Sequence, residues 1–250
     1  MRPTVTVITP CRNAGRWIGS TIESVIAQDF RDWEMLIVDD ASEDGSAEVA
    51  KHTANRDSRV RLTRVEYRIG GAEARNHAIS EARGRYLAFL DADDFWMPYK
   101  LSRQLQFMKD VGAGFAYTGY EKCDEEGKRN DRIFIPPTLI HYKPLLRTCV
   151  IGCSTVILDR TVVGRRYMPL LPSGHDFALW LDILRDGYEA HGLPEPLTVY
   201  RERGGSLSAN KLAKSRMTWH IYRQREGLGR MASTRLMASY AWNGFRKRLI

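Results

Sequence analysis

The chain of 250 residues lacks several features that would each define a class of protein. No run of apolar residues approaches the roughly eighteen needed to cross a membrane, and the N-terminus has no apolar core of the kind found in signal peptides. The cysteines have neither the paired spacing of a zinc site nor the density of a disulfide framework; they are Cys11, Cys123, Cys149 and Cys153. Together these absences predict a protein of the reducing cytoplasm.

Two common phosphate-binding loops are also missing. The sequence contains neither Gly-x-x-x-x-Gly-Lys-Ser/Thr, whose backbone amides cradle nucleotide phosphates, nor the Gly-x-Gly-x-x-Gly of dinucleotide-binding folds. Any nucleotide site in this chain is therefore expected to use other residues.

Acidic residues are scarce towards the C-terminus. Residues 211–250 contain ten Lys or Arg and one acid, Glu226, whereas the first 210 residues contain 28 basic and 29 acidic side chains. A neutral body with a basic tail predicts that the tail meets an anionic surface. It argues against a nucleic-acid enzyme, because the active groove of such an enzyme would itself be basic.

The sequence is rich in alternating strand and helix patterns. Apolar residues make up 43% of the chain, which is enough for the core of one large α/β domain. We expect strands at 5–9, 33–38, 60–65, 86–90, 113–120 and 152–158, a hairpin or loop at 124–137, and helices at 15–28, from 45, at 72–82 and from about 176. This order predicts a Rossmann-like, mostly parallel central sheet with flanking helices.

Three acids follow the apolar run at 86–90, which is typical of a buried central strand: Asp91, Asp93 and Asp94. Residues two apart point to the same side of an extended chain, so Asp91 and Asp93 can converge on one object. Crowded carboxylates repel one another, and Mg²⁺ or Mn²⁺ relieves this by taking oxygen ligands that it shares with substrate phosphates. The simpler alternative is an Asp-rich turn that caps the next helix.

A second acidic pair, Asp39 and Asp40, closes the strand at 33–38. Parallel sheets bind ligands beyond the carboxyl ends of their strands, where both acidic groups are expected. One group could accept hydrogen bonds from a base and a ribose, while the other holds a metal on a diphosphate. Gly70 and Gly71 permit close approach of the backbone, although such a pair also suits an ordinary turn.

Asp176 stands at the start of a helical pattern whose buried face includes Leu179, Trp180 and Ile183. It is either the N-cap of that helix or, since it lies at the end of an element, a general base. His175, next to Asp176, is expected to lie on the polar surface or to contact the acceptor rather than to bind a metal.

Six segments resemble the family 2 inverting glycosyltransferases of the GT-A fold, and they follow one another in that family's order. They are VTVITPCRN at 5–13, IVDDASEDGS at 37–46, ARN at 74–76, GRYLAFLDADDFWMP at 84–98, HDFALWL at 175–181, and PLTVYR at 196–201 with Ser206 and Ser208. The resemblance covers nearly the whole chain. It implies a nucleotide-sugar donor, most often a UDP-sugar, and an acceptor hydroxyl.

The resemblance also implies a role for each matched residue. Asp40 would hydrogen-bond the nucleobase, Asp91 would lie near the ribose, and Asp93 would ligate Mn²⁺ or Mg²⁺. Asp176 would be the general base that removes the acceptor proton during inverting attack on C1. The donor-binding set implied in this way is Pro10, Arg12, Asp39, Asp40, Arg75, Asp91, Ala92 and Arg203.

Two residues depart from the family pattern. His175 stands where the family commonly has an acid or Gln before the base, and Arg203 stands where many relatives carry a metal-ligating His. Arg203 could instead face the diphosphate as a fixed cation. The Gln-x-x-Arg-Trp motif of processive polysaccharide synthases is missing, so addition of one sugar per encounter is expected.

The expected organisation is a GT-A catalytic domain at 1–205, with a donor-binding half at 1–110 and an acceptor-binding half at 111–205. Basic amphipathic helices are expected at 206–250, where aromatic residues are interleaved with Arg and Lys up to 246–248. This tail resembles that of bacterial enzymes that build surface polysaccharide on a lipid-linked acceptor, which implies a peripheral position on the inner membrane face. The alternative is a helix pair that packs on the catalytic domain.

Two other functions stay open at this point. Sugar-nucleotide pyrophosphorylases have a related architecture, but they carry a Gly-rich loop with Arg and Lys near the N-terminus, which residues 10–15 lack. The second alternative is a catalytically silent sugar-nucleotide-binding or membrane-scaffold protein. The presence of both Asp93 and Asp176 argues against it.

Overall fold

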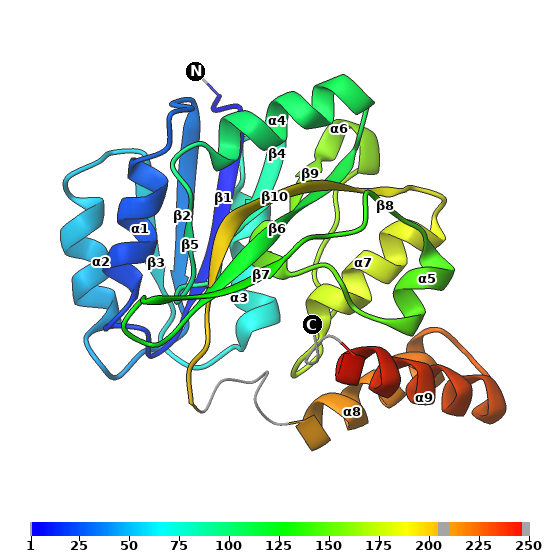
Figure 1. The fold of residues 1–250 in the computed structure, drawn as a ribbon. Helices are drawn as coiled ribbons and strands as arrows, with labels where there is room; N and C mark the ends of the chain where they lie inside the picture. Colours follow the sequence, from blue (N-terminus) through cyan, green and yellow to red (C-terminus); the bar gives the residue numbers. More distant parts are fainter. Residues whose placement is uncertain (1, 205–210, 247–250) are drawn as a thin grey trace.

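A single sheet forms the centre of the computed structural model, which describes residues 2–204 and 211–246 (Figure 1). Its strand order is β3-β2-β1-β4-β9-β6-β10-β5, with β7 paired to β6 and β8 paired to β10. The strands are β1 (Val5–Cys11), β2 (Trp33–Asp39), β3 (Val60–Arg64), β4 (Tyr86–Phe89), β5 (Phe95–Trp96), β6 (Phe115–Cys123), β7 (Arg129–Phe134), β8 (Leu139–Ile140), β9 (Ile157–Asp159) and β10 (Ala190–Arg201).

Helices cover both faces of this sheet. One buried apolar cluster joins α1, α2 and α4 to one face, and a second joins α3, α5 and α7 to the other. The helices are α1 (Ile18–Ile26), α2 (Ser46–Ala54), α3 (Gly71–Glu81), α4 (Lys100–Val111), α5 (Tyr142–Arg147), α6 (Arg160–Val163), α7 (His175–Arg185), α8 (Lys211–His220) and α9 (Arg230–Arg246), with a 3₁₀ helix at Cys153–Thr155 and a π-helix at Ile221–Arg225. The predicted α/β architecture is therefore confirmed.

The two halves of the sheet differ in strand direction. Strands β3, β2, β1 and β4 are parallel, as the alternation of strands and helices predicts. In the second half, β9 runs antiparallel to both β4 and β6, while β10 is parallel to β6. The prediction of a mostly parallel sheet thus holds for the first half only, because an apolar run buried on both faces has the same composition in either direction.

The expected strand at 152–158 forms only in part. Its first residues turn as the 3₁₀ helix, where Thr155 donates through its backbone N–H (3.0 Å) and its hydroxyl (2.7 Å) to the carbonyl of Gly152. The carbonyl of Ser154 accepts a hydrogen bond of 2.8 Å from the indole of Trp96. These tertiary contacts override the strand preference of the local sequence.

Helix α7 is held against the centre of the sheet by an aromatic cluster. The fully buried ring of Trp180 meets Phe89 of β4 edge-on at a centroid distance of 5.7 Å and Phe115 of β6 at 5.1 Å. The start of α7 is thereby positioned relative to the acids that follow β4.

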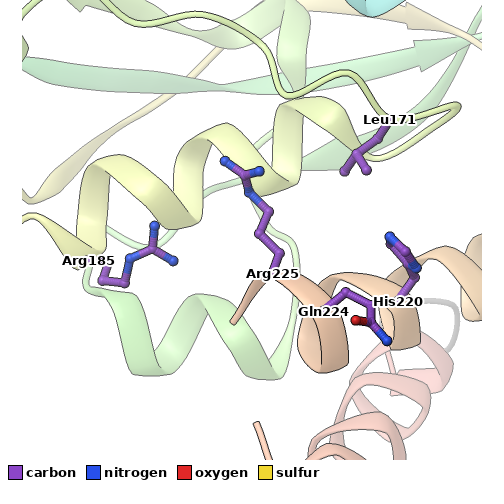
Figure 2. A pocket seen from close by; sticks show the side chains of 5 residues that line it. All are labelled: Leu171, Arg185, His220, Gln224 and Arg225. Carbon is purple, nitrogen blue, oxygen red and sulfur yellow. The ribbon is translucent and has the colours of Figure 1, made fainter. Parts of the chain in front are cut away.

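The C-terminal helices pack on α5 and α7. Ile221 and Tyr222 join the apolar core, and the hydroxyl of Tyr222 donates to the carbonyl of Leu146. Glu226 accepts a hydrogen bond of 2.6 Å from the Tyr142 hydroxyl, and Figure 2 shows Arg225 reaching from these helices towards α7. The described part of the tail therefore packs on the domain, while the predicted contact with a membrane stays a prediction.

Some expectations about the tail fall outside the described residues. Ser206 and Ser208 of the matched closing segment belong there, as do the basic residues 247 and 248. Within residues 2–204 and 211–246, no helix is both long enough and apolar enough to cross a membrane.

The packing of α7 can be tested with a matched pair of Leu→Ala changes. Leu181 is fully buried on this helix, whereas Leu170 is 69% exposed. We expect Leu181→Ala to lower the free energy of unfolding by about 2–5 kcal/mol, through lost burial and a residual cavity. Urea unfolding should show a much smaller effect for Leu170→Ala, and equal effects would contradict the burial of this face.

Candidate active site at the carboxyl end of β4

The acids after β4 lie in a tight turn that is fixed by its backbone. The Asp94 N–H donates to the carbonyl of Asp91 at 3.1 Å. The Thr21 hydroxyl of α1 lies 2.9 Å from the carbonyl oxygen of Ala92 and 2.8 Å from that of Asp94. The turn therefore presents its three carboxylates in a defined arrangement, and Ala92 of the same turn is buried.

Asp94 is the structural member of the three. Its carboxylate accepts hydrogen bonds from the Ser154 hydroxyl at 2.5 Å and from the Arg201 backbone N–H at 3.0 Å. Burial, together with the neighbouring charges of Asp93 and Asp91, raises the pKa of Asp94 well above its ordinary value. Asp94 thus ties the end of β10 to the end of β4.

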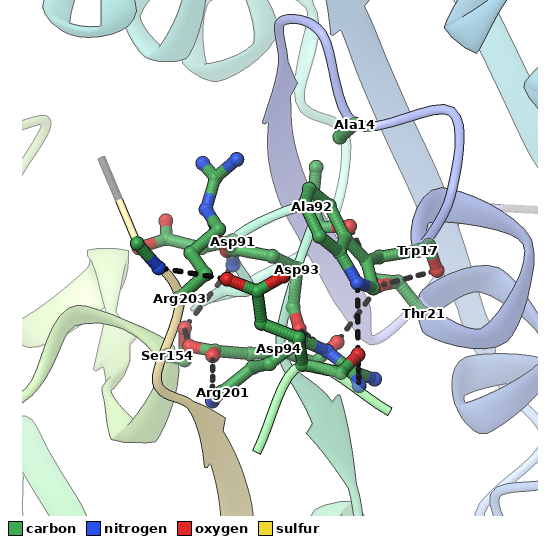
Figure 3. Close-up of polar contacts among 12 residues, drawn as sticks. Ala14, Trp17, Thr21, Asp91, Ala92, Asp93, Asp94, Ser154, Arg201 and Arg203 are labelled. Atoms are coloured by element: carbon green, nitrogen blue, oxygen red, sulfur yellow. Dashed lines mark hydrogen bonds and ion pairs between the residues drawn. The ribbon is translucent and has the colours of Figure 1, made fainter. Parts of the chain in front are cut away.

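Asp93 faces Arg203 across the site, as Figure 3 shows. The guanidinium Nε lies 2.6 Å from Asp93 Oδ2, and the same guanidinium stacks over the Trp17 ring at 4.9 Å. Burial and the charge of Asp91 raise the pKa of Asp93, while Arg203 opposes that shift. Arg203, which departs from the family pattern, therefore neutralises Asp93, the expected metal ligand.

Asp91 is paired with a different arginine. The buried Arg75 of α3 forms an ion pair with Asp91 through Nη2 and lies 2.8 Å from His175 Nε2 through Nη1. Burial, and then the charge of Arg75, lowers the pKa of His175, so its neutral ring accepts this hydrogen bond. His175 is thus buried inside the site, which corrects the expectation that it suits polar surface.

The acids after β4 can be compared with the ligand sets that Mn²⁺ and Mg²⁺ require. No group of three or more His, Cys, Asp or Glu side chains in the described part of the chain could hold a metal alone. Mg²⁺ is ordinarily held by one or two carboxylates together with substrate phosphates. Asp93, supported by Asp91, fits a metal that shares its ligands with a diphosphate, provided that Arg203 moves from Asp93.

The second acidic pair lies at the end of β2. Both carboxylate oxygens of Asp40 accept backbone hydrogen bonds from the loop before α3, from Ile69 at 2.6 Å and from Gly70 at 3.0 Å. Asp39 is fully buried beside Arg64, and its Oδ1 has no hydrogen-bond partner among the described residues. Each of these carboxylates retains lone pairs that could accept donors from a ligand.

The loops beside this pair are braced by Arg12, which follows β1 and Pro10. Its guanidinium donates to the carbonyl oxygens of Asp40 and Ala41. Two non-glycine residues in these loops have positive φ, Asn13 at 47° and Ala41 at 52°. Such conformations are strained and are often found at functional sites.

Asp176 lies in the first turn of α7. The N-cap position belongs to Gly174, whose φ is 67°, and no side chain caps this helix. The Asp176 side chain is partly exposed and forms no hydrogen bond or ion pair with the described residues. The N-cap interpretation is therefore wrong, and the carboxylate is available to a ligand.

The structure brings together Asp91, Asp93, Arg75 and Arg203, and the Arg75–His175 contact connects this group to the residue beside Asp176. Pro10, Arg12, Asp39 and Asp40 form a neighbouring group at the ends of β1 and β2. The sequence analysis missed the parts played by Trp17, Ser154 and Arg201. Arg201 lies within a matched segment, but Trp17 and Ser154 carry no motif.

Solved structures with the same arrangement of elements define the class of protein. TarS of S. aureus, in complex with UDP-GlcNAc, superposes with a TM-score of 0.74 at 18% identity, over 95% of this chain and 71% of that chain. The mannosyltransferase PcManGT of Pyrobaculum calidifontis, in complex with GDP-Man and Mn²⁺, gives a TM-score of 0.71 at 20% identity, over 96% of this chain and 69% of that chain. The fold is therefore the GT-A glycosyltransferase fold.

Sequence comparison identifies the family. The model for glycosyl transferase family 2 matches residues 6–165. The putative teichuronic acid biosynthesis glycosyltransferase TuaG of Bacillus subtilis is 40% identical over 99% of this chain and 98% of its own length. The chain belongs to glycosyl transferase family 2, as its six matched segments predict.

A relative with a more specific name is found in Escherichia coli. WfaP, the UDP-Glc:alpha-D-GlcNAc-diphosphoundecaprenol beta-1,3-glucosyltransferase, is 39% identical over 83% of this chain and 80% of its own length.

The buried His175 gives a prediction about pH. Because its folded-state pKa lies below the ordinary 6.5, the unfolded chain takes up a proton first as the pH falls. The corresponding stability is fully present above the ordinary pKa and is lost as the pH falls through the lower folded value. We expect His175→Gln, which keeps an acceptor for Arg75, to lose less free energy of unfolding than the parent on acidification.

Urea unfolding between about pH 7.5 and about pH 5 measures this difference. His52→Gln is the control, because His52 is exposed on α2. A pH slope that is the same for the parent and His175→Gln would contradict the lowered pKa.

Proposed function

We propose that this glycosyltransferase moves one sugar from a nucleotide-sugar, most simply a UDP-sugar, to a hydroxyl of a lipid-linked precursor of surface polysaccharide, with inversion at C1. The proposal rests on the carboxylate of Asp176, which has no hydrogen-bond or ion-pair partner among the described residues. Asp176 follows His175, which Arg75 connects to Asp91. These contacts support a single site with a proton acceptor and side chains suited to a diphosphate.

The donor is proposed to bind across the carboxyl ends of β1, β2 and β4. Asp39 and Asp40 accept hydrogen bonds from the nucleoside, with Arg12 and Pro10 shaping the adjoining loops. Asp91 lies towards the ribose, while Arg75 and Arg203 supply positive charge near the diphosphate. The position of these groups at strand ends is typical of ligand sites in open α/β sheets.

A divalent cation is proposed to accompany the donor, held by Asp93 with Asp91 and Ala92 beside it. Its chemical contribution when bound is to neutralise charge on the departing diphosphate. The complex of PcManGT with GDP-Man and Mn²⁺ supports this choice of cofactor. Arg203, released from Asp93, can then contact the diphosphate directly.

Asp176 is proposed to act as the general base. It removes the proton of the acceptor hydroxyl while that oxygen attacks C1 from the face opposite the diphosphate. The C1–O bond to the diphosphate breaks as the new C1–O bond forms, so the anomeric configuration inverts. The charge of Arg75 is close enough to influence this end of α7, and Asp176 in turn contributes to the raised pKa of Arg75.

The name of WfaP supports UDP-glucose as a donor to test and a GlcNAc-diphosphate lipid as an acceptor. With such an acceptor, residues 1–110 would serve as the donor-binding half and residues 111–205 as the acceptor-binding half. The basic residues of 206–250 would hold the protein on the inner face of the membrane as a peripheral protein, where anionic lipids attract Lys and Arg.

The function is tested by measuring glucose transfer from UDP-glucose to a synthetic GlcNAc-diphosphate lipid. We expect Asp176→Asn to lower kcat by about 10²-fold or more, the scale of general-base catalysis, with UDP-glucose affinity retained. The matched control is Asp186→Asn at the far end of α7, where the side chain pairs with Arg166. Unchanged turnover in Asp176→Asn would refute the base assignment, and absence of transfer by the parent would favour the scaffold alternative.

The cation site gives a second prediction. We expect Asp93→Ala to abolish Mn²⁺-dependent UDP-sugar binding in calorimetry while the circular dichroism spectrum stays unchanged. We expect Arg203→Ala to bind Mn²⁺ more tightly than the parent, because Arg203 no longer competes for Asp93. Arg16→Ala is the matched control, since Arg16 also lies near the Trp17 ring (5.9 Å) but pairs with Glu126. Equal Mn²⁺ affinity in Arg203→Ala and the parent would show that no competition exists.

A further inference from the structure

Two adjoining cavities lie on the C-terminal helices, away from the acids after β4. The first, of about 430 Å³, is lined by Leu171, Arg185, His220, Gln224 and Arg225 (Figure 2). The second, of about 520 Å³, is lined by Arg216, Trp219, His220, Arg223, Gln224 and Arg230. His220 and Gln224 border both cavities, so the two adjoin at α8 and the π-helix, and together they are called the groove.

The two cavities differ in how their positive charges are compensated. In the first, Arg185 pairs with Asp182 at 2.6 Å and with Glu226 at 3.0 Å, and Arg225 also pairs with Asp182. Its guanidinium groups are therefore neutralised by the protein itself.

The second cavity has three arginines and no acidic side chain in its lining. Arg223 donates to the carbonyl oxygen of Leu228 and so retains its charge. No acidic side chain in the described part of the chain pairs with Arg216 or Arg230. Guanidinium groups that line one cavity without an acidic partner there suit phosphate oxygens, which they bind in pairs of hydrogen bonds.

The groove also reaches the loop that precedes the proposed base. Leu171 of the first cavity lies in this loop, five positions before Asp176. The C-terminal helices touch the same loop, because a Cβ placed on Gly174 would lie 3.4 Å from Ile221 Cδ1 and 3.5 Å from Met217 Cγ. A molecule with its reacting end near Asp176 could therefore extend along the groove.

We propose that the second cavity binds the diphosphate group of the lipid-linked acceptor through Arg216, Arg223 and Arg230. This inference rests on the proposed function, because it takes the acceptor to be a sugar diphosphate lipid. Trp219, 36% exposed at the cavity, supplies an aromatic surface suited to the boundary between a charged group and a hydrocarbon chain. Leu212 and Met231, also exposed on α8 and α9, add apolar surface to the same helices.

The test uses the full chain with Mn²⁺ and saturating UDP, so that the donor site is filled. The probes are a short prenyl diphosphate, inorganic phosphate, and phosphatidylglycerol vesicles. The pocket variant is Arg216→Gln with Arg230→Gln. The control is Lys214→Gln with Arg235→Gln, which removes one charge from each of the same two helices outside the cavity lining.

We expect the pocket variant to bind the prenyl diphosphate at least about 10-fold more weakly, since it loses two charged hydrogen-bond donors. The control should change this affinity less than about 3-fold, because its effect is only long-range and screened by salt. UDP affinity should be the same in both variants. In the transfer assay, the pocket variant should raise KM for the lipid acceptor and leave kcat near the parent value.

Three outcomes would overturn the inference. Equal weakening in the pocket and control variants would mean that general positive charge binds the diphosphate. If the pocket variant loses vesicle binding but keeps its affinity for the prenyl diphosphate, the cavity binds lipid headgroups. If the parent binds inorganic phosphate as tightly as the prenyl diphosphate, the cavity binds free phosphate. If Asp176→Asn keeps full turnover while the pocket variant loses prenyl diphosphate affinity, the base assignment fails and the cavity assignment stands.

Discussion

The arrangement of the site depends on how three carboxylates are kept apart at the end of a single buried strand. Asp91, Asp93 and Asp94 occupy one turn, where unpaired charges would repel one another and resist burial. Each takes a different partner: Arg75 for Asp91, Arg203 for Asp93, and Ser154 with the Arg201 backbone N–H for Asp94. Because these partners come from distant segments, neutralising the turn also joins α3, the 3₁₀ helix and the end of β10 to β4.

The same contacts connect the acids after β4 with the proposed base. Arg75 bridges Asp91 and His175, and the aromatic packing of Trp180 holds α7 against β4 and β6. The position of Asp176 therefore depends on a packed aromatic core and on the partly buried Arg75–Asp91 ion pair. Sites supported in this way hold their reacting groups close to the geometry that the reaction requires.

Arg203 contacts the acids after β4, and the C-terminal helices contact the loop before α7. Arg203 gives an internal counter-charge to Asp93, the carboxylate that the proposed metal would use. The C-terminal helices contribute Ile221 and Tyr222 to the core and lie against the loop before α7. They are therefore an integral part of the folded domain, next to the segment that leads to Asp176.

The sequence by itself determined the strand and helix order of the first half, the acids at the ends of β2 and β4, and the place of Asp176 at the start of a helix. These features follow from periodicity and chain order, which are local properties. Only the tertiary structure decided the direction of β9, the structural part of Asp94, the burial of His175 and the docking of the tail. Each of these depends on which distant segments meet: an apolar run does not encode its direction, and a carboxylate or imidazole has no assigned partner until the chain folds around it.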